Sequence, residues 1–524
     1  MLKIDPRDRK HLIEPLLHFS TRFWTVAALL LILVILGLIA YIQQVEMGLG
    51  ETGMQRPAYW GIYMTNFVFF IGISLAGTFI SAILNLIGAD WRRPITRIAE
   101  AVTVFALVVA GIQIVVDMGR PDRLLYVFLY GRLQSPILWD VLVVTLYLLS
   151  SAFYLYLPII PDAAILRDNL PEHAPFWRHI LYRILALGWR GNVAQWSRLE
   201  KAISMMSLVA IPIAVSVHTI TSWILATTVQ PGWHSTVFGP YFVVTAVFSG
   251  ISGLFLAMTT IRRVFHLEEY ITLHHYRNLG LLFLTMSIIW GYFTYAESLT
   301  LAAGQQTMEF PVLASKLWGQ DSPSFWIMLG LIGLAFWMML VLHTMPRFIA
   351  RIRLFQPRIT LGFAVIATGI VALLSDPEWL FPEAAIPPLG SELSLILLIL
   401  AGLSALVGIS VWSKRHPIGT TLVAGTCVLA GTWMERWNIV VPTVTHPRLI
   451  PYSSYAPTAI EIVLTIGSVA LMFLGLLVFF KLFPPVPIWE VQEGRVIEDA
   501  HSKLEIPVPK PSDPQIRKRR WQFR

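Results

Sequence analysis

Polar side chains capable of chemistry stand inside long apolar stretches of this sequence. Asn66, Asp140, His218 and Glu435 each lie within such a stretch, and Arg436 directly follows Glu435. A charge near the centre of a bilayer costs at least ~2.5–3.5 kcal/mol on insertion scales, so such residues usually have a function. Together they offer hydrogen-bond donors, hydrogen-bond acceptors and, in histidine, a group that exchanges protons near neutral pH.

The depth of these groups indicates what they bind. With the N-terminus taken as cytoplasmic, most lie in the outer half of the membrane, whereas Glu100 and His343 lie towards the inside. Charged side chains at helix ends can simply snorkel to the interface. The alternative is a quinone site, which needs an apolar slot near the interface, hydrogen-bond donors and a proton-exchanging group. Asn66, His218 and Glu435 favour a quinone because they lie deeper.

Other redox cofactors lack ligands in this chain. Two histidines at one depth would be needed for a haem b, but His218 and His343 are separated by about nine residues of helix, or ~14 Å. Cys427 is the only cysteine, which excludes cysteine-ligated iron–sulfur clusters and a C-x-x-C-H haem attachment. We therefore expect no haem, iron–sulfur cluster or metal bound by this chain itself.

Composition predicts the elements that must position these groups. Apolar residues make up 56% of the 524 residues and charged residues only 13%, against about 25% charged in soluble domains. Several apolar stretches exceed the ~20 residues that cross a bilayer. The expected fold is all-α, a polytopic transmembrane helix bundle. Its twelve expected spans are 22–44, 60–88, 95–116, 137–158, 202–228, 238–262, 276–302, 324–348, 358–375, 392–412, 418–441 and 458–484.

Loop charges predict the orientation. Lys and Arg gather in alternate loops, which puts both termini on the cytoplasmic side of a bacterial inner membrane. The net charge of +8 therefore does not require nucleic acid. This arrangement gives a cytoplasmic segment 1–21, a transmembrane domain 22–484 and a cytoplasmic, weakly structured tail 485–524. The outer loop 117–136 is unusually rich in arginine. Two explanations are open: local ion pairing, or a docking surface for an extracytoplasmic partner.

A direct repeat divides the spans. Gly61 and Gly72 of one span reappear as Gly239 and Gly250 four spans later, eleven residues apart in both. Repeats that run in the same direction predict bundles related by an axis along the membrane normal. We expect two four-helix bundles, within 60–228 and 238–375.

The motif Ser-Pro-x-x-Trp opens one span in each repeat. In the first repeat Asp140 follows the tryptophan, whereas Ile327 takes that place in the second. Because only the first repeat carries this acid, we expect the quinone site within 60–228.

These residues also resemble a known family. The chain is similar to the NrfD/PsrC-type integral membrane subunits of the polysulfide reductase family, and within them to the ActC-type subunit of alternative complex III. The similarity runs from about residue 57 to 485. It rests on the stretches Thr65-Asn66-Phe67-Val68, Gly119-Arg120-Pro121, Ser135-Pro136-Ile137-Leu138-Trp139-Asp140, Ser216-Val217-His218, Pro231-Gly232-Trp233-His234 and Glu435-Arg436.

The resemblance implies a subunit of a quinol:acceptor oxidoreductase that is active only within a respiratory or photosynthetic complex. Quinone, such as menaquinone, would be the bound substrate, and electrons would pass to or from a ferredoxin-like iron–sulfur subunit on the extracytoplasmic side. A c-type cytochrome, a molybdopterin-like subunit and a second homologous membrane subunit are further possible partners, besides the lipid bilayer; no nucleic acid is expected.

The resemblance also assigns site residues by position. It implies that Asp140 and His218 are catalytic and that Asn66 shares the quinone pocket with them. Arg120 and Glu435 would support this pocket. Asp117 and Arg436 complete the set expected to bind the quinone.

Two departures from the family pattern leave other functions open. Leu75 and Ile224 stand where the family often has a histidine and an aspartate, and the spans 358–375 and 392–412 form an additional pair. A structural anchor of the same kind of complex, without quinone turnover, is one alternative. A secondary transporter is the other, because twelve spans and parallel repeats suit transporters as well.

Overall fold

The computed structural model describes residues 6–171, 174–228, 230–346, 356–375, 391–448 and 451–492. Every regular element among these residues is a helix, as expected where lipid leaves backbone groups no partner except their own helix. Eleven helices are long and apolar enough to cross a membrane. The chain is therefore a polytopic membrane protein, as predicted. The remaining predicted span, 358–375, falls on α16 (Pro357–Ser375), which counts only as a shorter apolar helix.

The first bundle holds the helices expected for the first repeat. They are α4 (Ile62–Gly77), continued by the π-helical turn η3 (Thr78–Ile83), α6 (Arg93–Asp117), α8 (Pro136–Tyr156) and α11 (Val193–Thr227). Gly77 allows α4 and α6 to approach closely, since a Cβ atom there would lie 2.5 Å from the Ala99 carbonyl oxygen. At the start of α11, the Asn192 side chain accepts a hydrogen bond from the Gln195 backbone N–H and caps the helix.

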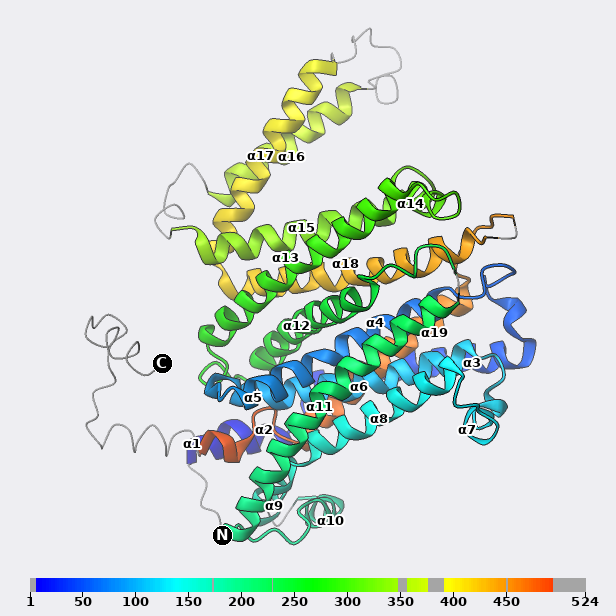
Figure 1. Cartoon of the computed structure of the whole chain (residues 1–524). Coiled ribbons are helices and arrows are strands. Elements are labelled where there is room, and N and C mark those ends of the chain that lie inside the picture. Colours follow the sequence, from blue (N-terminus) through cyan, green and yellow to red (C-terminus); the bar gives the residue numbers. More distant parts are fainter. Residues whose placement is uncertain are drawn as a thin grey trace, which may run out of the picture.

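The second bundle differs from the expected range 238–375 in its fourth helix. It consists of α12 (Phe238–Val264), α13 (Leu273–Gly304), α15 (Ser322–Thr344) and α18 (Pro417–Thr445). The helix expected in fourth place, α16, instead pairs with α17 (Ser391–Arg415), and this hairpin projects from the bundle (Figure 1). α18 packs against both α12 and α15. The additional pair is thus an insertion between the third and fourth helices of the repeat.

The two bundles meet where the repeated glycines cross. α4 packs directly on α12. A Cβ atom at Gly250 would lie 2.7 Å from the Ala76 backbone nitrogen, and one at Gly72 would lie 3.2 Å from the Ser249 hydroxyl oxygen. The second glycine of each repeated pair therefore allows α4 and α12 to approach closely, whereas Gly61 and Gly239 pack against Tyr455 and Ser222.

Two further spans flank the first bundle. α3 (Thr21–Met47) and α19 (Ala459–Leu482) pack together, with Gly37 and Gly467 in backbone contact. α3 exposes most of its apolar side chains, as a lipid-facing helix does. The short helices are α1 (Pro6–Asp8), η1 (Arg9–Ile13), α2 (Glu14–Leu17), η2 (Leu49–Glu51), α5 (Leu84–Leu86), η4 (Asp90–Arg92), η5 (Pro121–Arg123), α7 (Tyr126–Leu129), α9 (Ile159–Asn169), α10 (Phe176–Leu185) and α14 (Phe310–Leu317).

The bundle has two ends, which we name after one residue each. The Asp117 face contains Asp117, the start of α8 and α12 and the end of α11 and α18, together with α7 and α14 (Figure 1). The Asp162 face contains Asp162, Arg92 and the helices α1, α2, α9 and α10.

Part of the tail expected to be weakly structured is ordered. Residues 485–492 pack on the Asp162 face, where Asp162 accepts hydrogen bonds from the backbone nitrogens of Ile488 (3.0 Å) and Trp489 (3.2 Å). Arg97 donates to the same carboxylate at 2.6 Å and to the Pro484 carbonyl at 3.1 Å. The rest of the predicted tail, 493–524, lies outside the described residues.

Candidate functional site

His218 lies in the contact between α11 and α4. Its side chain is 1% exposed. Nδ1 lies 2.8 Å from the Ala214 carbonyl oxygen on the same helix, and Nε2 lies 3.2 Å from the Ile71 carbonyl oxygen on α4. A neutral imidazole has one N–H and can donate only one of these hydrogen bonds, whereas a protonated ring can donate both. The His218 ring therefore bridges α11 and α4 between two backbone carbonyl oxygens.

Asp140 is joined to the same helix. It lies in the first turns of α8, whose start is fixed by Pro136 in the first helical position. One of its carboxylate oxygens accepts a hydrogen bond of 2.9 Å from the Thr221 hydroxyl on α11. Thr221 follows His218 by less than one helical turn. The structure thus brings Asp140 and His218, the two predicted catalytic residues, to one segment of α11 near the Asp117 face.

Asn66 belongs to a different contact of α4. Its amide nitrogen donates to the Thr465 hydroxyl on α19 at 3.0 Å, and its amide oxygen accepts from the Trp433 indole N–H on α18 at 2.9 Å. Both polar ends of the side chain are therefore engaged with α18 and α19. Asn66 fixes the position of α4 against these helices and is not joined to the Asp140 and His218 pair.

Glu435 and Arg436 of α18 contact other helices of the second bundle. One Glu435 oxygen accepts hydrogen bonds from the Thr245 hydroxyl and the Trp290 indole, both 3.0 Å, within the second bundle. The Arg436 guanidinium lies 4.7 Å from the centre of the Phe242 ring and acts electrostatically on His218. Glu435 and Arg436 therefore hold α18 against α12 and α13.

Asp117 and Arg120 lie apart from this group. Asp117 interacts electrostatically with Glu461 of α19. Arg120 is exposed and forms an ion pair of 2.9 Å with Asp122, an arrangement that contributes little energy at a surface. For Arg120 the structure thus agrees with local ion pairing, the first of the two interpretations of loop 117–136. Sequence reasoning grouped residues that share a depth, but depth alone does not bring side chains on different helix faces together.

An open groove borders α11 on the side that faces α12 and α13, away from His218 and Asp140. Its cavity volume is about 760 Å³, and it lies between α11, α12, α13 and the segment before α12. Thr219 and Trp223 of α11, Trp233 and His234 of the segment, and Phe293 of α13 line it. Neither Asp140 nor His218 lines this groove. Thr219, however, directly follows His218 in the chain.

The groove wall is held by residues whose role sequence reasoning missed. The Trp233 indole donates to the Ile439 carbonyl oxygen on α18 at 2.9 Å and stacks on Trp60. His234 lies 2.8 Å from Glu309, the residue before α14. Gly232 has a φ of +83°, which lets the chain turn into this wall. The sequence signal for these residues is the family motif at 231–234. The motif alone does not indicate that they form the wall of a groove.

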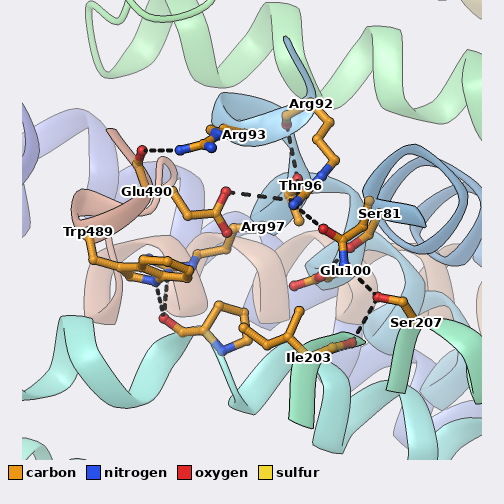
Figure 2. A network of polar contacts seen from close by, with 12 residues as sticks. Ser81, Arg92, Arg93, Thr96, Arg97, Glu100, Ile203, Ser207, Trp489 and Glu490 are labelled. Atoms are coloured by element: carbon orange, nitrogen blue, oxygen red, sulfur yellow. Dashed lines mark hydrogen bonds and ion pairs between the residues drawn. The ribbon is translucent and has the colours of Figure 1, made fainter. Parts of the chain in front are cut away.

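A separate polar network covers the Asp162 face (Figure 2). Ser81 donates to Glu100 at 2.6 Å, and Tyr154 joins Ser81 to Ser207. His343 lies in the second bundle instead, with Nε2 3.2 Å from the Arg277 carbonyl oxygen. The two inner residues singled out from the sequence, Glu100 and His343, are thus in different bundles. Among the described residues, no group of three or more His, Cys, Asp or Glu side chains could hold a metal ion.

The fold and these buried polar groups define a polytopic helical membrane protein. Residues 50–373 match the family model described as "Polysulphide reductase, NrfD". The chain therefore belongs to the NrfD family, which confirms the resemblance at family level.

Three curated relatives are similar to parts of the chain. One is a putative dimethyl sulfoxide reductase membrane subunit of Halobacterium salinarum, 31% identical over 44% of this chain and 49% of the relative. Another is the Hdr-like menaquinol oxidoreductase integral membrane subunit of Archaeoglobus fulgidus, 24% identical over 62% of this chain and 72% of the relative. The third is a selenate reductase subunit of Mesobacillus selenatarsenatis, 21% identical over 41% of this chain and 51% of the relative. The chain spans about half the length of the first and third relatives.

Proposed function

We propose that this chain is the quinone-binding membrane subunit of a multisubunit oxidoreductase. Membership of the NrfD family supports this, as do relatives named as membrane subunits of a reductase and of a menaquinol oxidoreductase. The single observation that carries the proposal is the arrangement around α11. This helix carries the buried His218 and the Thr221 hydroxyl that binds Asp140, and it also borders a lateral groove.

In this proposal the quinone enters laterally, from the lipid. The groove is lined mostly by apolar and aromatic side chains, which suit an apolar tail and a flat ring. Trp223 provides an exposed aromatic surface at the Asp117 end, where a head group would sit, and the buried Trp233 supports the groove wall there. The sequence pointed to a pocket among spans two to five. The groove favours a site on the α12 and α13 side of the fifth span, α11.

The chemistry assigned to the chain is proton exchange. Oxidation of a quinol to a quinone releases two electrons and two protons. His218, held between two carbonyl oxygens, and Asp140, whose carboxylate is held by the Thr221 hydroxyl, are the proposed acceptors of these protons. Because neither residue lines the groove, each proton reaches its acceptor by way of α11 and not by direct contact with the head group. The electrons leave to an iron–sulfur cluster of a partner subunit on the Asp117 face. A complex that reduces quinone would use the same groups in reverse.

One structural observation favours a second candidate, an anchor without quinone turnover. Leu75, at the position where the family often has a histidine, is 3% exposed and belongs to the apolar core of the first bundle. No proton can be exchanged there. The two candidates differ in whether His218 and Asp140 matter for turnover.

The test is quinol-dependent electron transfer by the intact complex. We expect Asp140→Asn and His218→Ala each to lower the rate by about 10²–10⁴-fold, the usual contribution of a positioned acid or base. Asp122→Asn, which removes an exposed carboxylate on the same face, serves as the control and should leave the rate unchanged. Unchanged rates in both test variants would reject these assignments and support the anchor.

A further inference from the structure

One short helix on the Asp162 face carries an apolar stripe on its outer side. α10 lies at the edge of the bundle there (Figure 1). Its exposed apolar side chains are Phe176, Trp177, Ile180 and Ile184. With 3.6 residues per turn, these four positions fall within an arc of about 100°. The buried Arg178 and Tyr182 lie on roughly the opposite side of the helix. α10 therefore docks on the protein with one side and presents a second, apolar side outwards.

The docked side fixes the height of α10 along the bundle. The Tyr182 hydroxyl donates a hydrogen bond of 2.7 Å to the carbonyl oxygen of Leu482, the last residue of α19. The hydroxyl of Tyr156, the last residue of α8, donates one of 2.8 Å to the Leu185 carbonyl oxygen. Both α8 and α19 are membrane spans by length and hydropathy. α10 therefore lies where two spans end, which is the level of the bilayer surface.

The contact with α8 also places α10 on the outside of the bundle. Leu149 and Phe153, in the last two turns of α8, are exposed, as side chains that face lipid are. These two residues and Tyr156 fall within an arc of about 60° on α8. Because Tyr156 is the residue that bonds to α10, the short helix lies on the lipid-facing side of this span. The apolar surface of α8 thus continues onto the outer side of α10.

Basic side chains accompany the apolar stripe. The exposed ones are Arg183 on α10, Arg190 in the turn that follows, and Arg198 and Lys201 in the first turns of α11. Between residues 176 and 201 the sequence has one acidic residue, Glu200. Within the part of the chain that the structure describes, none of the four basic side chains forms an ion pair. Unpaired Arg and Lys beside aromatic and aliphatic residues complement anionic lipid, which offers phosphate groups and acyl chains at one level.

We propose that α10 is an interfacial helix that binds anionic phospholipid. The four apolar side chains of its outer side enter the acyl-chain region of the leaflet, and Arg183 and Arg190 bind lipid phosphate groups. Bound lipid thereby presses α10 against the ends of α8 and α19, where Tyr156 and Tyr182 hold it. This binding site does not depend on quinone binding or turnover.

The first test asks what covers the apolar stripe in the intact complex, reconstituted into lipid vesicles. Cys427 is the only cysteine of the chain, so the complex with Cys427→Ser gives the background for a bimane label on Ile184→Cys. The control carries the label on Ser197→Cys, an exposed position in the first turns of α11. Brominated phospholipid should quench the label at 184 several-fold more strongly than aqueous iodide does, and the order should reverse at 197. Stronger quenching by iodide at 184 would show a water-exposed face and overturn the proposal. Protection from both quenchers would show a protein partner there and overturn it as well.

The second test measures the preference for anionic lipid at the same label. Quenching at 184 by brominated phosphatidylglycerol and by brominated phosphatidylcholine, each in mixed membranes, gives the relative affinity of the two lipids at α10. Arg183→Gln with Arg190→Gln should lower the preference for phosphatidylglycerol by about fivefold for each charge removed, or ~1 kcal/mol. Arg123→Gln with Arg132→Gln removes two exposed charges from loop 117–136 instead and should leave the preference unchanged. Equal affinity for the two lipids, or a preference that survives the loss of Arg183 and Arg190, would overturn the anionic-lipid site.

Discussion

The ion pair between Arg97 and Asp162 gives the most quantitative prediction. Both side chains are 0% exposed, and the guanidinium nitrogen lies 2.6 Å from the carboxylate oxygen. Asp162→Ala would leave the Arg97 charge buried without its partner. It would also leave the Ile488 and Trp489 backbone N–H groups without an acceptor. Breaking one partner of a buried pair typically costs about 3–5 kcal/mol. Part of the cost is relieved if residues 485–492 detach from the Asp162 face.

The population of the detached segment gives the magnitude. Every 1.4 kcal/mol changes an equilibrium about tenfold, so Asp162→Ala should raise that population roughly 10²- to 10³-fold. The assay is maleimide labelling of Val486→Cys in the Cys427→Ser background, because Val486 is 0% exposed when docked. The control is Asp168→Ala, which breaks the partly exposed pair with Arg167 and should cost no more than ~1 kcal/mol. Equal labelling rates in the two variants would refute the assigned role of the pair.

Two other predictions concern packing and pH. Gly250→Ala would place a Cβ atom 2.7 Å from the Ala76 backbone nitrogen, so it should lower the unfolding temperature in detergent by the equivalent of about 1–3 kcal/mol or more. The control, Gly291→Ala, has open space around it and should leave the unfolding temperature unchanged. Equal effects of the two substitutions would contradict the crossing of α4 and α12. Burial raises the pKa of Glu490 to about 7 against the attraction of Arg92, Arg97 and Arg93. Because the docked segment favours the protonated form of Glu490, this group stabilises docking fully at pH values below ~4.3, the ordinary pKa of a glutamate. That stabilisation is lost as the pH rises through about 7. The measurement is the labelling rate of Val486→Cys, divided at each pH by the rate in the same protein that also carries Glu490→Gln. This ratio should increase across this pH range. A ratio that does not change with pH would exclude this role for Glu490.

Sequence patterns predicted the class of fold because lipid imposes a simple rule on helices. A long apolar stretch must form a helix across the membrane, and eleven of the twelve predicted spans meet that description. One glycine of each repeated pair, Gly72 and Gly250, lies in the contact between α4 and α12. The position of α18 in the second bundle was not predicted, because an inserted hairpin separates it from α15 in the chain and partner choice depends on side-chain packing.

The candidate site was predictable in part for a related reason. Hydropathy gives the depth of a polar residue but not the side of the helix on which its contacts lie. Asp140 and His218 share a depth, and Asp140 also bonds to Thr221, which lies three residues after His218 on α11. Asn66 and Glu435 share the depth but turn to other helices. The groove depends on residues between spans, such as Trp233, whose role comes from a turn and a distant carbonyl oxygen.

Labelling with a photoreactive quinone tests the central claim most directly. The probe would be a menaquinone analogue with a small photoreactive group on its ring, applied to the intact complex and mapped by peptide sequencing. The account predicts labelled peptides from the C-terminal part of α11 and from residues 233–240, suppressed by excess menaquinol. Labelling confined to other helices, or labelling that excess menaquinol does not reduce, would contradict it.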